Sequence, residues 1–443
     1  MPRRTLWLIF AVVVVSLACY ERADRNPYGR WFAEVLDTID RNYVEPVDEQ
    51  KLFEGALDGV IGKLDEYSAF LSRNDAPQFQ QVLDQQYGGI GIEVTLEGAD
   101  KQLTVMSPFV GTPAYKAGVR AGDTIVAIDG RSTKNRPLNE IVRWLKGRPG
   151  DPVAIEVVRK GHEKPLRFDL VRAKIRVDSV LGDLREPDGT WNFFLPGEDK
   201  IGYVRITAFG ESTVEEFTAA LQWLSARRCR GLILDLRNDP GGLLEAAKAV
   251  CDLFLPEGAV IVSTRGRDAR IHDEATATGA GEYQSLPLVV LVNDKSASAA
   301  EIVAACMQDH KRAAIVGERT WGKGTVQNVI PLEGGRSLLK LTIASYWRPS
   351  GKNIHRLESS QDEDEWGVKA DPGCELKLDD KQTGELLEQR RQRDVVHSVG
   401  YSPGEPVPAP PAGSPADFDP QLTRAVEVLK ERLGEKAARA GAA

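Results

Sequence analysis

The sequence predicts a multidomain α/β protein, and three observations support this fold class. The chain has 443 residues, enough for two to four domains at about 100 to 200 residues each. A glycine-rich segment that begins at Tyr87 ends a stretch of helical spacing, and from Ala173 apolar strands alternate with amphipathic helices. A content of 42% apolar and 28% charged residues is typical of globular proteins, so we exclude a disordered or collagen-like chain.

The charge and the cysteine content narrow the classes of function. The formal net charge is -8 and no long basic run occurs, which argues against nucleic acid as the main partner. The five cysteines are widely spaced and form no CxxC pair, so the sequence indicates neither a zinc site nor a disulfide framework. We expect structural thiols and a protein that needs no metal or organic cofactor.

Residues 1–26 are typical of an export signal or a membrane anchor. Arg3 and Arg4 precede an apolar run from Leu6 to Ala18, which has the length of a signal peptide and is short for a relaxed membrane span. Cleavage, retention as a signal anchor and lipid attachment at Cys19 all stay open. We expect an exported protein of the cell envelope, on the periplasmic side, tethered to the membrane through this segment.

Residues 27–86 are predicted to form a helical lobe. Apolar residues recur at helical spacing in two successive stretches. The first contains Phe32, Val35, Leu36, Ile39 and Tyr43, and the second contains Leu52, Ala56, Leu57, Val60, Ile61 and Leu64. We expect this lobe to serve packing or homodimerisation.

Residues 87–172 change to a pattern of short strands, turns and two helices. Thr112 is placed to cap a short helix, Pro113 suits its first turn, and Gly118 suits the left-handed position after its end. Further strands are predicted over 124–128 and 153–159, with a helix over 138–146 between them.

The Gly-Thr-Pro-Ala, Ala-Gly and Gly-Asp motifs of this stretch resemble those of a PDZ domain, in the circularly shifted form found in exported bacterial proteases. The resemblance implies that the end of a peptide adds to the sheet as a strand, while backbone N–H groups of a glycine loop bind its carboxylate. The matching loop contains Gly88, Gly89, Ile90 and Gly91. A glycine cluster by itself is also compatible with a plain hairpin turn.

Residues 173–375 carry the α/β pattern and are predicted to be the catalytic core. The predicted strands are 201–206, 231–236, 288–292 and 313–316, and the predicted helices are 214–226, 242–254 and 298–307. A charged helical segment (376–402), a stiff Pro-rich linker (403–417) and a last amphipathic helix with its tail (418–443) follow.

The segment from Val292 to Glu301 is predicted to end a buried strand and to begin a helix, with Ser298 at the helix N-cap. As a structural residue, Ser298 would form a capping box with Glu301. As a catalytic residue, it would project a nucleophilic hydroxyl from the turn, next to N–H groups that stabilise an oxyanion. These residues alone are compatible with both interpretations.

The segment from Gly317 to Gln327 supplies a candidate base. The five histidines show no grouping that suggests a Ser-His-Asp triad, which leaves Lys323. Its pKa would have to fall from about 10.4 toward about 7 to 8, and we expect the flanking glycines and Trp321 to help by excluding water. Lys323 and Gln327 have the same parity, so on a strand the Gln327 amide would orient the amine. A Gly-Lys-Gly sequence by itself is more typical of a solvated turn.

A third segment, from Asp235 to Leu244, again ends a strand and begins a helix. The backbone N–H of Gly242, or next that of Gly241, is placed to complete an oxyanion hole with the N–H of Ala299. Without the other two segments, an ordinary strand-turn-helix explains this pattern equally well.

Together the motifs Asp-Leu-Arg-Asn-x-Pro-Gly-Gly, Ser-Ala-Ser-Ala-x-Glu and Gly-Lys-Gly-Thr-Val-Gln resemble those of the carboxy-terminal processing peptidases, also called tail-specific proteases. The resemblance implies a crotonase-like (ClpP/crotonase) catalytic core with an inserted PDZ domain. It also implies that Ser298 is the nucleophile, Lys323 the general base and Gln327 its support. In some members an arginine near the end of the PDZ domain senses the bound peptide, and Arg159 is the candidate here.

We therefore expect an exported serine endopeptidase that recognises the C-terminal tail of protein or peptide substrates and cleaves them through an acyl-enzyme on Ser298. The competing hypothesis is a PDZ scaffold that binds peptides and has an idle crotonase-like core. The acyl-transfer or hydratase chemistry of other crotonase-like folds would need a thioester pocket, of which the sequence gives no sign.

Overall fold

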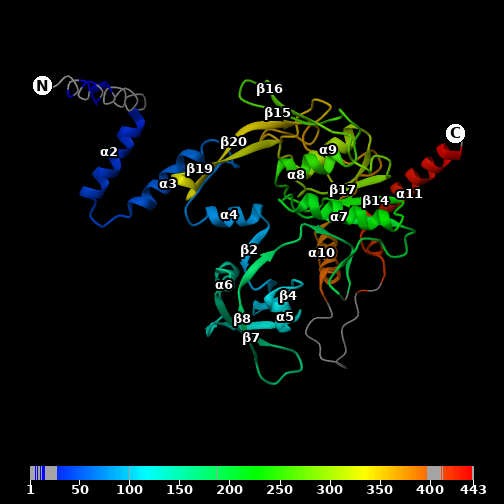
Figure 1. The fold of residues 1–443 in the computed structure, drawn as a ribbon, viewed down its shortest axis with the longest axis horizontal. Helices are drawn as coiled ribbons and strands as arrows, with labels where there is room; N and C mark the ends of the chain where they lie inside the picture. The colour runs from blue at the N-terminus through cyan, green and yellow to red at the C-terminus, as the bar shows by residue number, and fades with distance from the viewer. Residues whose placement is uncertain are drawn as a thin grey trace. The chain divides into compact units, whose positions relative to one another are not determined.

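A computed structural model gives the fold of residues 5, 7, 10, 12–14, 27–98, 100–186, 188–396, 411 and 413–441 (Figure 1). Cys19, most of the predicted export segment and most of the predicted Pro-rich linker lie outside these residues. The chain divides into two compact units, one formed by Met1–Ala76 with Gln327–Thr342 and the other by Pro77–Val326 with Ile343–Ala443. Within the described ranges, no helix combines the length and the apolar character needed to cross a membrane.

The first unit contains the two helices expected in the helical lobe, α2 (Pro27–Asn42) and α3 (Glu49–Ile61). Asp48 caps α3, since its carboxylate accepts a hydrogen bond from the Lys51 N–H. A short strand, β1 (Ala69–Leu71), then pairs antiparallel with the first half of β20 (Ser337–Trp347). No residue of α2 is buried, and Tyr28 and Trp31 are each more than half exposed, so the apolar stripe of this helix faces solvent in the single chain.

In the second unit, α4 (Ala76–Leu83) leads into the stretch predicted to be a PDZ domain. This stretch forms a six-stranded antiparallel sheet, in which the order β3-β4-β5-β7-β8 leaves β3 at one edge and β6 pairs with β5. Its elements are β3 (Ile92–Glu97), β4 (Gln102–Pro108), α5 (Pro113–Ala117), β5 (Thr124–Ile128), β6 (Arg131–Ser132), α6 (Leu138–Leu145), β7 (Pro152–Val158) and β8 (Leu166–Val171). Two linking strands, β2 (Gln86–Gly89) and β9 (Ala173–Arg176), pair with each other where the chain enters and leaves this sheet.

The turn at α5 follows the sequence-based prediction with one difference. Gly118 adopts a φ of +82° just after the helix, as the left-handed position requires. Thr112 lies at the N-cap, but its hydroxyl donates to the carbonyls of Gly91 and Phe109 and does not cap the helix. Thr112 therefore fastens the glycine loop to the start of α5.

The α/β core contains a sheet of five strands in the order β10-β13-β14-β17-β18, of which the last four are parallel. The bounds of its strands are β10 (Val180–Leu181), β13 (Ile201–Ile206), β14 (Gly231–Asp235), β17 (Leu288–Val292) and β18 (Ala313–Gly317). All residues of these four parallel strands are buried, which is typical of a sheet covered on both faces.

Helices cover the two faces of this sheet, as the alternation of side chains along β14 shows. Leu232 and Leu234 point to one face and pack with α7 (Thr213–Ala226), α8 (Leu244–Asp252) and α9 (Ala299–Asp309). Ile233 points to the other face, where it packs with Leu422 and Leu429 of α11 (Pro420–Gly441). Each such fully buried aliphatic side chain contributes about 1.5 to 3 kcal/mol of transfer free energy. The C-terminal helix is thus part of the α/β core.

The remaining elements surround this sheet. They are β11 (Leu184–Arg185), β12 (Trp191–Asn192), β15 (Val260–Arg265), β16 (Ile271–Thr276), β19 (Thr325–Leu332), the short 3-10 helices Glu333–Gly335 and Pro415–Asp417, and α10 (Asp380–Asp394). In the second unit, β15 pairs with β16 and with the last residues of β20. The predicted charged helical segment corresponds to α10.

The register of the parallel strands places the three sequence motifs at one edge of the sheet. Asp235 of β14 lies opposite Leu291 of β17, and Val292 of β17 lies opposite Gly317 of β18. The loops 236–243, 293–298 and 318–324 therefore all leave the sheet at the carboxyl ends of neighbouring strands, where open α/β sheets place their sites.

Candidate active site

Ser298 lies on a strained turn between β17 and α9. Its φ and ψ are +55° and −112°, a backbone conformation that costs a residue with a side chain about 1 to 3 kcal/mol and persists only where the surroundings enforce it. Only 6% of the residue is exposed. The neighbouring Ser296 is committed to structure, because its hydroxyl donates to the Leu236 carbonyl and accepts from the Asn293 N–H. Of the two serines in the motif, Ser298 is the one on the strained turn.

Glu301 connects the Ser298 turn to the loop that contains Lys323 (residues 318–324), here called the lysine loop. One carboxylate oxygen, Oε2, accepts the backbone N–H groups of both Ser298 and Lys323, each at 2.8 Å. The other, Oε1, accepts the Gly322 N–H at 2.7 Å and the Thr320 hydroxyl at 2.5 Å. Glu301 is fully buried, and this burial raises its pKa to about 6 although the four hydrogen bonds act in the opposite direction. The sequence indicated Glu301 only as a capping partner of Ser298, and its contacts with the lysine loop were missed.

The lysine loop packs tightly against the segment around His355. This close packing, and not the predicted exclusion of water, explains why positions 322 and 324 are glycine. A side chain at Gly324 would place its Cβ 2.3 Å from the His355 backbone nitrogen, and one at Gly322 would lie 2.7 Å from the Arg356 Cβ. Two expectations about this loop were wrong. Trp321 is half exposed at 50%, and β19 begins only at Thr325, so Lys323 precedes the strand and shares no strand face with Gln327.

Gln327 belongs to the first unit, and its contacts there are with β20. Its amide nitrogen donates to the Thr342 hydroxyl at 3.2 Å. The Thr342 hydroxyl in turn donates to the Asp65 carboxylate at 3.1 Å. The predicted support of Lys323 by Gln327 stays a prediction.

The glycine loop after β14 approaches Ser298 closely. A Cβ on Gly241 would lie 2.8 Å from both the Ala299 nitrogen and the Ser298 Cβ, and one on Gly242 would lie 2.1 Å from the Phe209 carbonyl oxygen. The Gly241 N–H already donates to Asp239 Oδ1 at 2.7 Å. Among the described residues we find no acceptor for the N–H of Gly242 or of Ala299. Of the two glycines that the sequence indicated, only Gly242 therefore has an N–H available for an oxyanion.

Asp239 is a buried carboxyl within this loop that the sequence did not indicate. Its backbone carbonyl accepts the Ala297 N–H at 2.9 Å, which ties the loop to the Ser298 turn. Its Oδ2 has no hydrogen-bond partner in the described part of the chain. Burial raises the pKa of Asp239 well above its usual value, so we expect this carboxyl to be neutral in the folded protein.

The predicted peptide groove lies between β3 and α6. A cavity of about 260 Å³ is lined mainly by apolar side chains, among them Ile92, Val94, Val142 and Leu145. Gly88 and Gly89 belong to β2, whereas Ile90 and Gly91 form the loop itself, and their two N–H groups have no acceptor among the described residues. Gly91 must be glycine, since its φ is +77° and a Cβ would lie 2.4 Å from the Thr112 side chain.

The described hydrogen bonds of Arg159 lie within the PDZ stretch, and its predicted role as a sensor stays a prediction. Its guanidinium donates two hydrogen bonds of 2.7 Å to Asp123 and one of 2.8 Å to the Gly118 carbonyl. The Asp123 side chain is 1% exposed and that of Arg159 is 10% exposed. Arg159 is therefore an internal brace of the PDZ sheet, because a buried carboxylate needs a paired charge.

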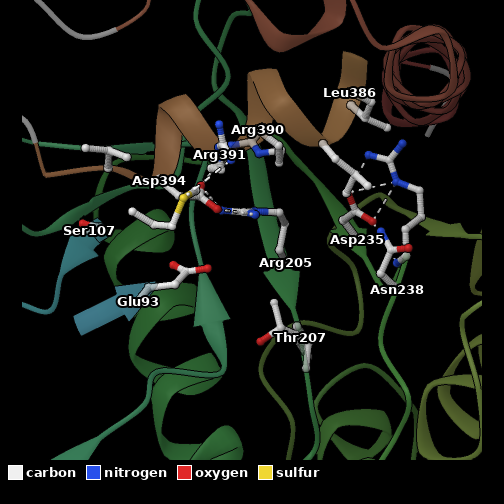
Figure 2. A pocket seen from close by; sticks show the side chains of 15 residues that line it. Glu93, Ser107, Arg205, Thr207, Asp235, Asn238, Leu386, Arg390, Arg391 and Asp394 are labelled. Carbon is white, nitrogen blue, oxygen red and sulfur yellow. Dashed lines mark hydrogen bonds and ion pairs between the residues drawn. The ribbon is translucent and has the colours of Figure 1, made fainter. Parts of the chain in front are cut away.

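One contact between the PDZ stretch and the core runs through α10 (Figure 2). Arg205 of β13 pairs with Asp394 of α10, and Arg391 of the same helix lies 3.5 Å from Glu97 of β3. Arg205, Arg391 and Asp394 border a cavity of about 390 Å³ that reaches from Glu93 to Asn238 in the loop after β14. Burial and the nearby Asp394 charge raise the pKa of Glu93, while Arg391 opposes the shift.

No group of three or more His, Cys, Asp or Glu side chains suited to a metal ion occurs in the part of the chain that the structure describes.

Comparison with known proteins agrees with this geometry. Residues 200–365 match the profile of peptidase family S41, residues 104–159 that of a PDZ domain, and residues 25–75 that of the N-terminal domain of the activating protease CtpB. The carboxy-terminal-processing protease of Bartonella bacilliformis is 36% identical over 363 residues, which cover 81% of this chain and 80% of that protein. The carboxy-terminal processing protease CtpB of Bacillus subtilis is 34% identical over 326 residues, or 73% of this chain and 65% of that protein.

A solved S41 protease from Bacteroides fragilis covers 80% of this chain and 92% of its own, at 16% identity and a TM-score of 0.50, which shows a likeness of fold alone. The sequence relatives and the matched profiles confirm the resemblance read from the motifs. The chain belongs to the carboxy-terminal processing proteases of peptidase family S41 and carries a PDZ domain.

Proposed function

We propose that the protein is a serine endopeptidase that recognises the C-terminal tail of exported proteins through its PDZ domain and cleaves them by a Ser-Lys mechanism. Ser298 is the nucleophile, Lys323 the general base and Gln327 its support. One observation carries the proposal: Glu301 Oε2 accepts the N–H groups of both Ser298 and Lys323, which makes the nucleophile turn and the base loop neighbours.

In the acylation step, Lys323 in its neutral form takes the proton of the Ser298 hydroxyl while the oxygen attacks the substrate carbonyl carbon. The negative charge on the carbonyl oxygen is stabilised by the N–H groups of Gly242 and Ala299. The intermediate then collapses to an ester, and the leaving amine takes the proton from Lys323. Lys323 then takes a proton from a water molecule that attacks the ester, and returns this proton to the Ser298 oxygen as the ester bond breaks and the new carboxyl end leaves.

The PDZ domain supplies recognition of the tail. The substrate end adds to the free edge of β3 as a strand, its carboxylate accepts the N–H groups of Ile90 and Gly91, and its apolar side chains enter the groove beside α6. The apolar lining of that groove and the two N–H groups without acceptors support this assignment. The cavity beside α10 gives the rest of the tail a route toward Asn238 and the catalytic loops.

The finer architecture is also part of the proposal. We assign residues 87–172 to the PDZ domain and 173–375 to a crotonase-like catalytic core, supported by the parallel sheet with helices on both faces. The exposed apolar stripe of α2 supports homodimerisation through the helical lobe. Export and a membrane tether rest on the apolar run after Arg3 and Arg4.

The test uses the full chain, peptides that differ only in their last residues, and a serine-directed fluorophosphonate. Wild type should yield fragments by mass spectrometry and become labelled on Ser298, whereas Ser298→Ala and Lys323→Ala should yield none. Lys295→Ala, which removes an exposed lysine next to the same turn, is the matched control and should behave as wild type. Tail-peptide binding without labelling of the wild type would favour the idle scaffold instead.

A further inference from the structure

We infer that the C-terminal helix supplies a positioning residue, Asp419, which sets the oxyanion loop through Arg237. The inference rests on the proposed function, because the loop in question, residues 238–242, contains the proposed oxyanion donor Gly242. Neither Arg237 nor Asp419 touches the reacting atoms. Their contribution is to hold Arg237, the residue immediately before the loop, in one position.

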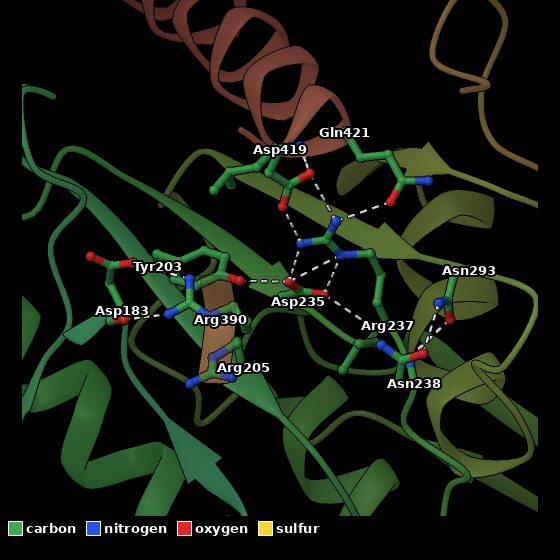
Figure 3. A network of polar contacts seen from close by, with 12 residues as sticks. Asp183, Tyr203, Arg205, Asp235, Arg237, Asn238, Asn293, Arg390, Asp419 and Gln421 are labelled. Atoms are coloured by element: carbon green, nitrogen blue, oxygen red, sulfur yellow. Dashed lines mark hydrogen bonds and ion pairs between the residues drawn. The ribbon is translucent and has the colours of Figure 1, made fainter. Parts of the chain in front are cut away.

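Arg237 lies between two carboxylates, Asp235 two residues before it in sequence and Asp419 near the start of the C-terminal helix (Figure 3). Its Nη2 lies 2.7 Å from Asp235 Oδ2 and 2.8 Å from Asp419 Oδ2. Its Nε donates to Asp235 at 3.0 Å, and its Nη1 donates to Asp419 at 3.1 Å and to the Gln421 side-chain oxygen at 3.0 Å. Every nitrogen of the guanidinium is thus engaged, which leaves Arg237 one orientation.

The burial of this cluster makes each partner necessary. The side chains of Arg237, Asp235 and Asp419 are 6%, 5% and 1% exposed. Asp235 also accepts the Tyr203 hydroxyl at 2.6 Å, and Asp419 accepts the Leu422 N–H at the start of α11. Removal of Arg237 leaves two buried carboxylates without their cation, and removal of the Asp419 carboxylate takes two acceptors from the guanidinium, so in each case the remaining members respond by moving.

The loop that follows Arg237 needs external restraint. Asn238 has a φ of +60°, an uncommon conformation for a residue with a side chain. Gly241 and Gly242, at +92° and +147°, adopt their conformations without a steric penalty and for the same reason have many others open to them. At the far end, the Leu243 N–H donates to the Phe209 carbonyl at 2.6 Å. At the near end, the restraints are the paired amides of Asn238 and Asn293 and the guanidinium of Arg237.

Asp419 reaches this position from 182 residues away in sequence. It immediately precedes α11, whose apolar side chains pack on the sheet face opposite α7, α8 and α9. The helix therefore contributes in two separable ways, through an apolar face that stabilises the core and through Asp419 that restrains the loop.

The test separates these two contributions. Asp419→Asn keeps the shape of the side chain and its ability to cap α11, but removes the charge that pairs with Arg237. We expect the kcat for a tailed peptide, and the rate of Ser298 labelling by a fluorophosphonate, to fall about tenfold, with the affinity of the PDZ domain for the tail unchanged. The control, Val426→Ala, removes a buried side chain from the apolar face of α11 and should lower the melting temperature without changing the kcat of the folded protein.

A second variant tests whether Asp419 acts through Arg237. Arg237→Gln should slow labelling by itself, and Asp419→Asn should add little in that background because the pathway is already broken. The inference would be overturned if the double variant showed the product of the two single-variant reductions in labelling rate. It would also be overturned if Asp419→Asn lowered the melting temperature but labelled at the wild-type rate. A wild type that does not label at all would refute the serine mechanism and the inference with it, whereas a labelled wild type keeps the two questions apart.

Discussion

Glu301→Gln should cost the protein most of its activity while leaving it folded. The carboxylate accepts four hydrogen bonds and donates none, so the amide nitrogen of glutamine would face two donors. Two buried groups left unsatisfied cost about 2 to 6 kcal/mol at about 1 to 3 kcal/mol each. The variant also gains stability, because its neutral amide does not carry the free-energy cost of burying an ionised carboxylate. The pKa of about 6 lies about 1.5 units above the usual 4.5, which at about 1.36 kcal/mol per unit is about 2 kcal/mol at pH 7.

The two effects leave a net destabilisation of about 0 to 4 kcal/mol, which a folded domain can survive. Catalysis should suffer more, because Oε2 is the atom that links Ser298 to Lys323. A loss of about 1.4 to 2.8 kcal/mol in positioning corresponds to a 10- to 100-fold lower kcat. The assay is kcat and KM on a tailed peptide, with Glu245→Gln as control, since Glu245 also lies in a first helical turn but is 81% exposed. A Glu301→Gln protein with wild-type kcat would refute the reasoning.

The folded pKa of Glu301 lies above its unfolded value, so wild-type stability should fall as pH rises from about 4.5 to about 6 and then level off, and Glu301→Gln should lack this step in urea unfolding. The raised pKa of Asp239 likewise predicts that the free energy of unfolding falls as pH rises above about 3.9. Asp239→Asn should therefore be more stable than wild type at pH 7, and equal stabilities would contradict a buried neutral carboxyl. Gly242→Ala should lose both activity and thermal stability because its Cβ meets a carbonyl at 2.1 Å, whereas Gly258→Ala, also at positive φ but in open space, should lose only about 1 kcal/mol. Arg159→Ala should destabilise the PDZ domain by about 3 to 5 kcal/mol and weaken tail binding, measured by calorimetry, while Arg167→Ala, which breaks an exposed pair, should leave stability nearly unchanged.

The sequence predicted two kinds of feature: the repeated apolar strands of the core, and backbone conformations that a single residue determines. The apolar runs of β13, β14, β17 and β18 mark buried parallel strands, and parallel strands must bring their carboxyl ends to one edge. The meeting of the three motifs follows from that rule alone. Gly118 was predictable for a similar reason, because a single residue determines the conformation at its own position.

The errors arose where the outcome depends on contacts between distant residues. The parity argument for Lys323 and Gln327 assumed a strand that begins two residues later, at Thr325. Trp321 was expected to exclude water, yet the packing against the lysine loop comes from backbone and side chains near His355 and is seen only in three dimensions. The pairing of Arg159 with the buried Asp123 was also not predicted, because no sequence spacing indicates that pair.

The same limit explains why the sequence indicated neither Asp239 nor Asp419 and gave Glu301 only a capping role, although the proposed site depends on all three carboxyls. The free-energy cost of burying each carboxyl is offset in a different way. Glu301 accepts four hydrogen bonds, Asp239 takes up a proton, and Asp419 pairs with an arginine. Glu301 restrains the base loop, the Asp239 carboxyl restrains Gly241 within the oxyanion loop, and Asp419 restrains the origin of that loop through Arg237. Burial raises the pKa of both Glu301 and Asp239, so we expect the ionisation of each to lower the free energy of unfolding as pH rises. The Glu301 contribution should be lost between about pH 4.5 and about pH 6, so a wild type that gains stability relative to Glu301→Gln over this range would contradict the burial of its charge.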